Sequence, residues 1–147
     1  MRITLIVVGK LKEKFLIAGV EEYLKRLKKF ATVEVREISE QRTIEEEGQK
    51  LLSLAPPNSW LCVLDVAGVP LSSEVFAKKI AALALDGVSN LTFAIGGAFG
   101  VSDELRRAAD FRLSLSQMTF THQIARLILA EQIYRAFKIN RNEPYHW

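Results

Sequence analysis

The sequence predicts an α/β fold in which a parallel sheet is covered by helices on both faces. Short runs of β-branched and other apolar residues recur along the chain, and segments with apolar residues at helical spacing separate them. Strands that alternate with helices form right-handed βαβ units, which place their strands parallel in one sheet. The length of 147 residues, with no linker and no internal repeat, predicts a single domain over residues 1–147.

The first half of the chain is expected to form strands at 3–8 and 33–38 and helices at 13–30 and 44–54. The first strand is a continuous apolar run, which is typical of a strand buried on both faces. The second alternates apolar and charged residues, so one of its sides faces water and it suits the edge of the sheet. In the second helix the first turn contains three consecutive glutamates, Glu45, Glu46 and Glu47, where the helix dipole stabilises anions.

The second half is expected to form strands at 60–65, 90–95 and 111–115 and helices at 103–109 and 121–137, with a further helix that runs to Leu85. Ser72 or Ser73 can cap that further helix, and Ser102 can cap the short one. A serine hydroxyl accepts hydrogen bonds from the free backbone N–H groups of a first turn. Two consecutive prolines mark the turn between the halves.

Composition limits where the protein can work. Cys62 is the only cysteine, which excludes an internal disulfide and a cysteine-based zinc site and fits a reducing cytosol. The longest charge-free run, 16 residues between Asp86 and Asp103, is shorter than the roughly 18 residues of a membrane span. The apolar run at 3–8 is too short for a signal peptide. We therefore expect a soluble, cytoplasmic protein with no membrane partner.

The formal net charge of +3 is unevenly distributed along the chain. Residues 1–30 carry a net +5, residues 31–102 a net −4 and residues 103–147 a net +2. Two basic ends around an acidic middle suit an anionic partner that touches both ends. Alternatively, these lysines and arginines form a solvated helix face whose only role is to keep the protein soluble.

A ligand site is expected beyond the carboxyl ends of the strands, where residues 64–68, 95–100 and 115–122 follow three of them. The glycine pair at 96–97 lets a ligand approach the backbone closely and leaves N–H groups free, although a plain turn uses glycines in the same way. In 115–122, main-chain groups beside Met118 and Phe120 can grip a purine ring. The alternative is an ordinary loop whose hydroxyl groups bind local backbone.

Several enzyme classes are excluded by missing motifs. A nicotinamide-binding reductase needs a glycine where Ala98 stands and an acidic partner for the ribose, and a P-loop ATPase needs a Gly-Lys-Ser/Thr loop. His122 and His146 are 24 residues apart, which is not a metal-ligand spacing, so no metal is expected. A serine hydrolase that uses His122 would lack the G-x-S-x-G turn.

The last helix and the tail carry further candidate residues. Glu131 precedes Arg135 by four residues and can pair with it, whereas Arg126 and Arg135 point to rather different sides of the helix. The arginine and glutamate fit either a surface ion pair or a charged group held beside a ligand. The terminal aromatic residues, Tyr145, His146 and Trp147, are expected to dock on a partner subunit or on unstacked bases.

Taken in order, these motifs resemble one known family. They are Leu64-Asp65-x-x-Gly68, Ile95-Gly96-Gly97-x-x-Gly100, Leu113-Ser114-Leu115-Ser116-x-Met118-Thr119-Phe120-x-His122, the run from Arg126 to Ala136, and Pro144-Tyr145-His146. Together with Val8-Gly9-Lys10 they are similar to the ribosomal RNA large subunit methyltransferase H family, over essentially the whole chain. Those enzymes belong to the SPOUT class and use S-adenosylmethionine to methylate N3 of a pseudouridine in 23S rRNA.

The resemblance implies a parallel-sheet α/β knot, with a C-terminal trefoil knot and a homodimeric assembly. The implied partner besides a second copy is 23S rRNA, in the large ribosomal subunit or in the assembled ribosome. The implied cofactor is S-adenosylmethionine, with no metal. The cofactor contacts carried over from the family fall on Leu64, Gly96, Leu115, Ser116, Gln117, Met118, Thr119 and Phe120.

The implied reaction requires alignment more than covalent catalysis. The sulfonium methyl group is already electrophilic, so the protein has to align it with the nucleophile and exclude water. The ring nitrogen must lose its proton, and histidine side chains suit that task, which makes His146 and His122 candidate bases. Arg126 and Arg135 are expected to stabilise the developing anion or to hold phosphates, and Tyr145 completes the candidate catalytic set. The family tail commonly continues with arginine where this chain has Trp147.

A different class of function is a non-catalytic ribosome-binding factor that keeps the fold and has lost the cofactor. The intact glycine loop at 96–100 argues against this alternative. A calorimetric titration with S-adenosylmethionine separates the two functions, because only the enzyme binds it.

Overall fold

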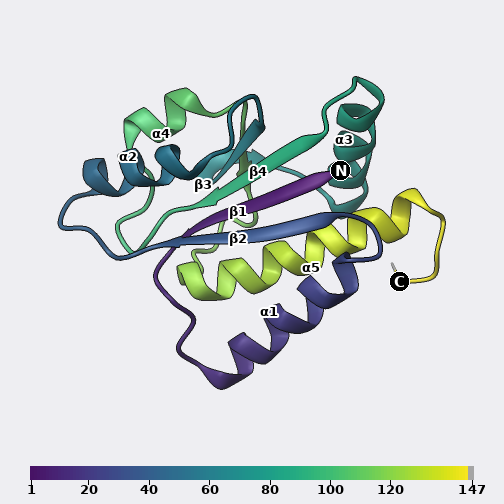
Figure 1. The fold of residues 1–147 in the computed structure, drawn as a ribbon, viewed down its shortest axis with the longest axis horizontal. Coiled ribbons are helices and arrows are strands. Elements are labelled where there is room, and N and C mark those ends of the chain that lie inside the picture. Colours follow the sequence, from purple (N-terminus) through teal and green to yellow (C-terminus); the bar gives the residue numbers. More distant parts are fainter. Residues whose placement is uncertain (146–147) are drawn as a thin grey trace.

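The computed structural model describes residues 1–145 and contains one five-stranded sheet in the order β2-β1-β4-β3-β5 (Figure 1). All strand pairs are parallel. The strands are β1 (Arg2–Val8), β2 (Thr32–Ile38), β3 (Trp60–Pro70), β4 (Asn90–Ile95) and β5 (Phe111–Ser114). The helices are α1 (Lys14–Leu27), α2 (Ile44–Leu54), α3 (Ser73–Leu85), α4 (Asp103–Ala108) and α5 (His122–Asn140). The predicted alternation of strands and helices is confirmed.

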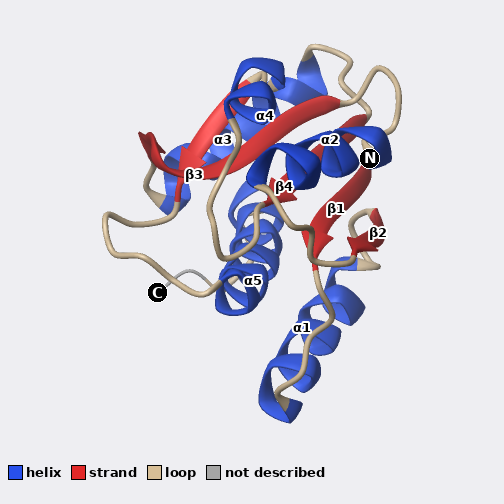
Figure 2. Cartoon of the chain, turned by 90° about the vertical axis from the view of Figure 1, so that its left-hand side faces the viewer, coloured by secondary structure: helices blue, strands red, loops and turns tan. Residues whose placement is uncertain are grey.

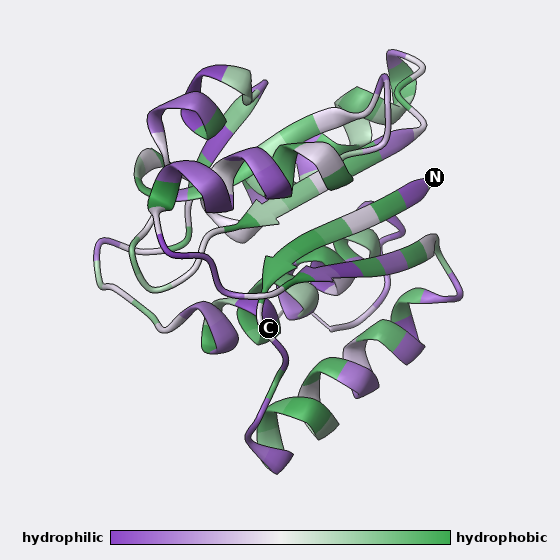
Figure 3. Cartoon of the chain, turned by 60° about the vertical axis from the view of Figure 1, so that its left-hand side comes forward, coloured by the Kyte–Doolittle hydropathy of each residue, from purple (hydrophilic) through white to green (hydrophobic). Residues whose placement is uncertain are grey.

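Helices cover both faces of the sheet, because side chains of successive strand residues point to opposite faces. On one face Ile3 and Leu5 of β1 pack in a core with α1, α3 and α5, whereas on the other face Ile6 and Val8 pack against α2 and α4. α1 and α5 lie side by side on their face of the sheet (Figure 1, Figure 2). In Figure 3 the central strands β1 and β4 are mostly hydrophobic, whereas α1 alternates between hydrophobic and hydrophilic residues.

The middle of the sheet joins segments that are far apart in the sequence. β1 pairs with β4 in a register that places Arg2 opposite Asn90 and Val7 opposite Ile95. β2 lies at one edge, as its alternating charges predict, because an edge strand can keep one side in water. Because β3, β4 and β5 are parallel neighbours, their carboxyl ends point to the same end of the sheet.

β3 is longer than the sequence predicts, and this is the main correction to the expected elements. The prediction ended at Asp65, whereas the strand continues to Pro70 after a register shift between Leu64 and Val69. Gly68 lies in the shifted segment, where a Cβ atom would be 2.6 Å from the carbonyl oxygen of Arg112. Only glycine permits this close approach of two backbones.

Two helices begin at predicted caps. The hydroxyl groups of Ser72 and Ser102 each accept a backbone N–H of the first turn of α3 and α4, and Thr121, which was not predicted as a cap, does the same for α5. α1 ends three residues earlier than predicted and α5 continues three residues further, to Asn140. Within residues 1–145 no helix is both long enough and apolar enough to cross a membrane.

Cys62 is a core residue of β3 and is fully buried between the helices and the sheet. Burial raises the pKa of its thiol to about 12, so the thiol stays protonated at neutral pH. The side chain therefore acts as a small apolar packing group.

Candidate functional site

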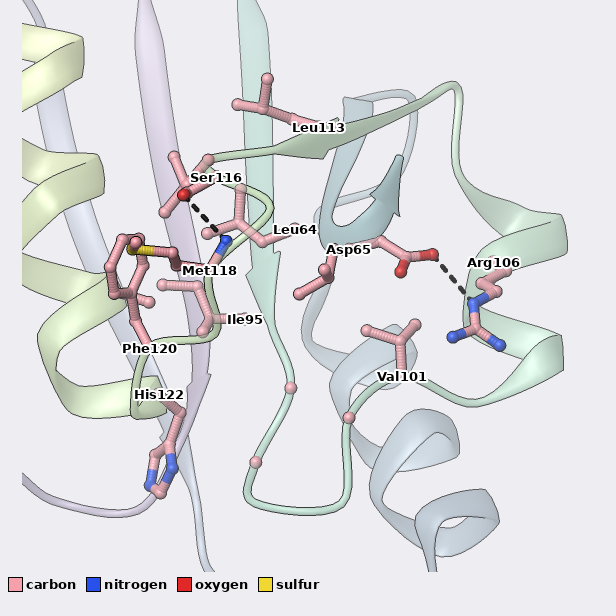
Figure 4. A pocket seen from close by; sticks show the side chains of 16 residues that line it. Leu64, Asp65, Ile95, Val101, Arg106, Leu113, Ser116, Met118, Phe120 and His122 are labelled. Atoms are coloured by element: carbon pink, nitrogen blue, oxygen red, sulfur yellow. Dashed lines mark hydrogen bonds and ion pairs between the residues drawn. The ribbon is translucent and has the colours of Figure 1, made fainter. Parts of the chain in front are cut away.

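A cavity of about 240 Å³ lies where the shifted part of β3 and the loops after β4 and β5 meet the first turn of α5 (Figure 4). The three segments that the sequence places at the carboxyl ends of the strands all contribute to its wall. The lining residues are Leu64, Asp65, Val66, Ile95, Gly96, Gly97, Gly100, Val101, Arg106, Leu113, Leu115, Ser116, Met118, Phe120, His122 and Ala125. The mixture of apolar side chains and exposed backbone is typical of a small-molecule site.

The glycine loop after β4 forms one wall of the cavity. Gly97 and Gly100 form an isolated antiparallel bridge, and the Gly100 N–H donates to the Gly97 carbonyl oxygen over 3.1 Å. A Cβ atom on Gly96 would lie 2.4 Å from the Gly100 carbonyl oxygen, so the two limbs of the loop are in backbone contact. Gly100 has a φ of +88°, which a residue with a side chain adopts only with strain.

The loop after β5 forms the opposite wall. The Ser116 hydroxyl accepts the N–H of Met118 over 3.0 Å, and the Ser114 hydroxyl donates to the Ser116 carbonyl oxygen. These short-range bonds hold the loop, as the alternative interpretation of its hydroxyl groups predicts. Met118 is 75% exposed and Phe120 41% exposed, so apolar surface is available at the rim of the cavity.

The eight predicted cofactor residues do not all reach the cavity. Six of them line it, namely Leu64, Gly96, Leu115, Ser116, Met118 and Phe120. Gln117 and Thr119 are exposed and are absent from its lining. The loop bends at 115, 117 and 118, and this folding turns Gln117 and Thr119 away from the cavity that their neighbours line.

Asp65 lies at the other end of the cavity, at the carboxyl end of the buried part of β3. Its carboxylate accepts from Nε of Arg106 over 2.9 Å and from Nη1 of Arg112 over 3.3 Å, and Oδ1 accepts from the Ala67 N–H. Burial by itself would raise the pKa of Asp65, but the hydrogen bonds from Arg106 and Ala67 and the charges of the two arginines lower it overall. The carboxylate therefore stays ionised and fixes Arg106 at the rim.

Replacing Asp65 by asparagine is expected to lower the free energy of unfolding at pH 7 by about 1 kcal/mol. Because the pKa of Asp65 is lower in the folded state, the carboxylate stabilises the fold above the unfolded-state value of about pH 4. This stabilisation is lost as the pH falls through the folded-state value. Urea denaturation should therefore show a difference between D65N and wild type that shrinks from pH 7 to pH 3. The exposed Asp86→Asn is the control, and an undiminished difference at pH 3 would contradict the assignment.

His122 begins α5 and lines the cavity, and its side chain lies to the left of the glycine loop in Figure 4. Its Nε2 atom is buried and has no hydrogen-bond partner among the described residues. A Cβ atom on Gly9 would lie 4.0 Å from this nitrogen, so the residue after β1 lies beside the ring without crowding it. A buried ring nitrogen without a partner is uncommon in a folded protein, which makes His122 a candidate contact for a bound ligand.

Arg126 lies one turn further along α5 and is buried away from the cavity. Nη1 donates to Oε2 of Glu37 over 3.0 Å, and Nη2 donates to the carbonyl oxygens of Gly9 over 2.8 Å and of Val8 over 3.4 Å. The guanidinium thereby ties α5 to the ends of β1 and β2. This geometry favours bracing of the fold, a role that the sequence did not predict, over the predicted contact with the developing anion or with phosphates.

Replacing Arg126 by methionine is expected to destabilise the fold by about 2 kcal/mol, because two buried carbonyl groups lose their donor. Methionine keeps the volume of the side-chain stem, so the loss reports mainly on the hydrogen bonds. Chemical denaturation measures it, with the exposed Arg107→Met as the control. Wild-type stability of R126M would contradict this bracing role.

Arg135 and Tyr145 lie together on the α1 side of α5 and do not line the cavity. Arg135 is paired with Glu131 as predicted, and its guanidinium lies 4.9 Å from the ring centroid of Tyr145. The Tyr145 hydroxyl bonds Glu131 over 3.1 Å and lies 3.2 Å from the hydroxyl of Tyr23. Tyr145 thus docks on its own chain, whereas the sequence predicts that it docks on a partner subunit or on unstacked bases. His146 and Trp147 lie outside the described residues.

The predicted cofactor contacts omit Asp65, Gly97 and Gly100, although the segments expected at the ligand site contain them, and sequence reasoning did not assign Arg106 to the site at all. Asp65 and the glycines belong to the quoted motifs, so a signal was present for them. No sequence signal pointed to Arg106, because only the packing of α4 beside β3 brings it to Asp65. In the part of the chain from 1 to 145 no group of histidine, cysteine or acidic residues is arranged to hold a metal ion.

The chain is similar to known methyltransferases over almost its whole length. A family model described as "Predicted SPOUT methyltransferase" matches residues 1–146. The ribosomal RNA large subunit methyltransferase H of Halothermothrix orenii is 49% identical, and that of Clostridioides difficile is 46% identical, each over 99% of both chains. A probable methylase family protein from Haemophilus influenzae Rd KW20 superposes with a TM-score of 0.55 at 10% identity, covering 95% of this chain and 66% of that one. The last likeness supports the fold alone.

Proposed function

Because the chain belongs to the SPOUT methyltransferase family, we propose that it transfers the methyl group of S-adenosylmethionine to N3 of a pseudouridine in 23S ribosomal RNA. The observation that carries this proposal is the cavity itself, formed by β3 and the loops after β4 and β5 in a chain that is 49% identical to a named rRNA methyltransferase. The proposed place of action is the cytoplasm.

The cavity fits S-adenosylmethionine in the chemistry of its wall. Leu64, Ile95 and Leu115 supply apolar surface for the faces of an adenine ring, and the glycine loop lets its backbone approach a ligand closely. The buried, unpartnered Nε2 of His122 is one polar atom that a ligand can satisfy. When bound, S-adenosylmethionine supplies an electrophilic methyl group. Arg106, which is paired with Asp65 and Asp103, places a guanidinium group at the rim, where it could meet an anionic group of cofactor or RNA.

A second cavity, of about 300 Å³, supports RNA as the partner. It lies between the ends of α1 and α5 and is lined by Arg26, Lys29, Phe30, Tyr134, Lys138, Arg141 and Glu143. The four cations outnumber the single carboxylate, and Arg141 lies 4.6 Å from the ring centroid of Phe30. Clustered lysine and arginine side chains bind phosphates independently of sequence, so this basic cleft suits the backbone of an RNA.

We extend the proposal to the homodimer and to the C-terminal trefoil knot that the family implies. Support for the dimer comes from apolar side chains left in water on the paired helices, Phe15 of α1 at 67% exposure and Ile124 of α5 at 37%. Arg135 and Tyr145 do not line the cavity of their own chain, so their proposed catalytic role requires the cavity of a second copy. The dimer would therefore complete the site.

Mass spectrometry of 23S rRNA from cells with and without the gene tests the proposal. Loss of one methyl group from a pseudouridine, restored by a plasmid copy, is the expected result. An unchanged rRNA would contradict the activity. Calorimetry that detects no S-adenosylmethionine binding would favour the non-catalytic ribosome-binding factor.

A further inference from the structure

The buried glutamate of α2 is the feature that the proposed mechanism leaves unused. Glu45, Glu46 and Glu47 all lie in the first turn, and the helix dipole stabilises each of them. Glu45 and Glu46 are exposed, whereas Glu47 is only 3% exposed. A buried carboxylate is costly unless hydrogen bonds compensate for its lost hydration, so its position requires a specific partner.

The partner is the glycine loop of the cofactor cavity. Oε1 of Glu47 accepts the backbone N–H of Gly97 over 2.8 Å, across 50 positions of the sequence. A Cβ atom on Gly97 would lie 2.8 Å from Oε2 of the same carboxylate, so a side chain at 97 would displace it. Position 97 therefore has to be glycine for this contact to form.

The next residue of α2 fixes the helix at the other end of the same loop. A Cβ atom on Gly48 would lie 2.1 Å from Oγ of Ser102, the residue that caps α4. Glu47 and Gly48 thus contact the chain at both 97 and 102. The cavity lies on the far side of this loop from α2, since no residue of α2 lines it.

The hydrogen bond also fixes the direction of one peptide plane. In a trans peptide the N–H and the carbonyl group point in opposite directions. When the Gly97 N–H points at Glu47, the carbonyl oxygen of Gly96 points away from α2. Without Glu47 the Gly96–Gly97 peptide can rotate, because glycine restricts neither flanking dihedral angle.

We infer that Glu47 is a positioning residue of the cofactor site, which holds the Gly96–Gly97 peptide in the orientation that S-adenosylmethionine binds. This inference rests on the proposed function. Glu47 acts through the loop and does not touch the ligand. What matters is an acceptor oxygen at the right distance, and the negative charge is secondary.

Two conservative variants separate these contributions. Glu47→Gln keeps the side-chain length and an acceptor oxygen but removes the charge, whereas Glu47→Asp keeps the charge and withdraws the oxygens by one methylene group. Calorimetric titration with S-adenosylmethionine should show E47Q within about threefold of wild type and E47D weakened about tenfold or more. Glu46→Gln and Glu46→Asp, on the exposed neighbour, should bind as wild type does. Circular dichroism verifies that each variant is folded.

Steady-state kinetics with the ribosomal substrate supply a second readout. E47D should raise the KM for S-adenosylmethionine and leave kcat largely unchanged, a separation that a general loss of folded protein would not produce. Equal binding by E47D and wild type, or weak binding by E47Q with strong binding by E47D, would overturn the inference while the proposed function stands. Absence of binding by wild type would overturn both.

Discussion

Replacing Gly96 by valine is expected to abolish the binding of S-adenosylmethionine while the sheet and helices stay folded. From the sequence alone, the reason would be that valine fills space needed by the ligand. The structure moves the first clash into the loop itself, because a Cβ atom at 96 would lie 2.4 Å from the carbonyl oxygen of Gly100. That contact is with backbone, so the loop has to open before any side chain fits. We expect affinity to fall about a hundredfold or more.

Calorimetry measures this loss, and circular dichroism with thermal unfolding reports whether G96V is folded. Ala98→Val is the matched control, since residue 98 belongs to the same loop, is exposed and does not line the cavity. A98V should bind within about twofold of wild type. Undiminished binding by G96V would contradict the placement of the cofactor against this loop.

Replacing His146 by alanine is expected to lower the rate of methylation about a hundredfold, with little effect on cofactor binding. The ring nitrogen of the substrate has to lose its proton, and the tail offers two groups for that task. Burial, the hydrogen bond with Tyr23 and the charge of Glu131 raise the pKa of Tyr145, so its phenol keeps its proton at neutral pH. Tyr145 is thereby a poor base, which leaves the histidine beside it as the candidate within the tail.

Single-turnover methylation of ribosomal particles with a labelled methyl donor measures the H146A rate. His122→Ala is the informative comparison, because His122 is the other histidine and lines the cofactor cavity. We expect H122A to weaken cofactor binding and H146A to slow the chemical step. A normal rate for H146A would remove the tail from the mechanism, and a slow step with normal binding in H122A would make His122 the base.

The elements of this fold could be predicted because their signals are local. Apolar periodicity placed all ten helices and strands within the described residues, and hydroxyl side chains identified the starts of α3 and α4. The extension of β3 to Pro70 could not be predicted, because residues 65–68 leave the ladder and only pairing with β5 restores it. That pairing is a tertiary contact with no local signature.

The candidate site divides in the same way. Its three loops follow from the rule that ligands bind at the carboxyl ends of parallel strands, and six of the eight predicted cofactor residues line the cavity. The residues that support the site from outside its loops were found only in the three-dimensional structure. In the sequence Glu47 is one of three similar glutamates, and only the packing of α2 on the loop shows its bond to Gly97. Likewise, only the packing of α5 on β1 shows that Arg126 binds the backbone of Gly9.

The pairing of β1 with β4 has a consequence for how the protein is made. The second residue of the chain lies opposite Asn90, so the centre of the sheet cannot form until more than half of the chain has been synthesised. Until then a growing chain can offer β1 only β2, and a two-stranded sheet is marginally stable in water. We expect the nascent chain to stay largely unfolded until late in translation and then to fold slowly, as chains rich in long-range contacts do. The apolar strand β1 would therefore be exposed to chaperones before β4 is available to pair with it.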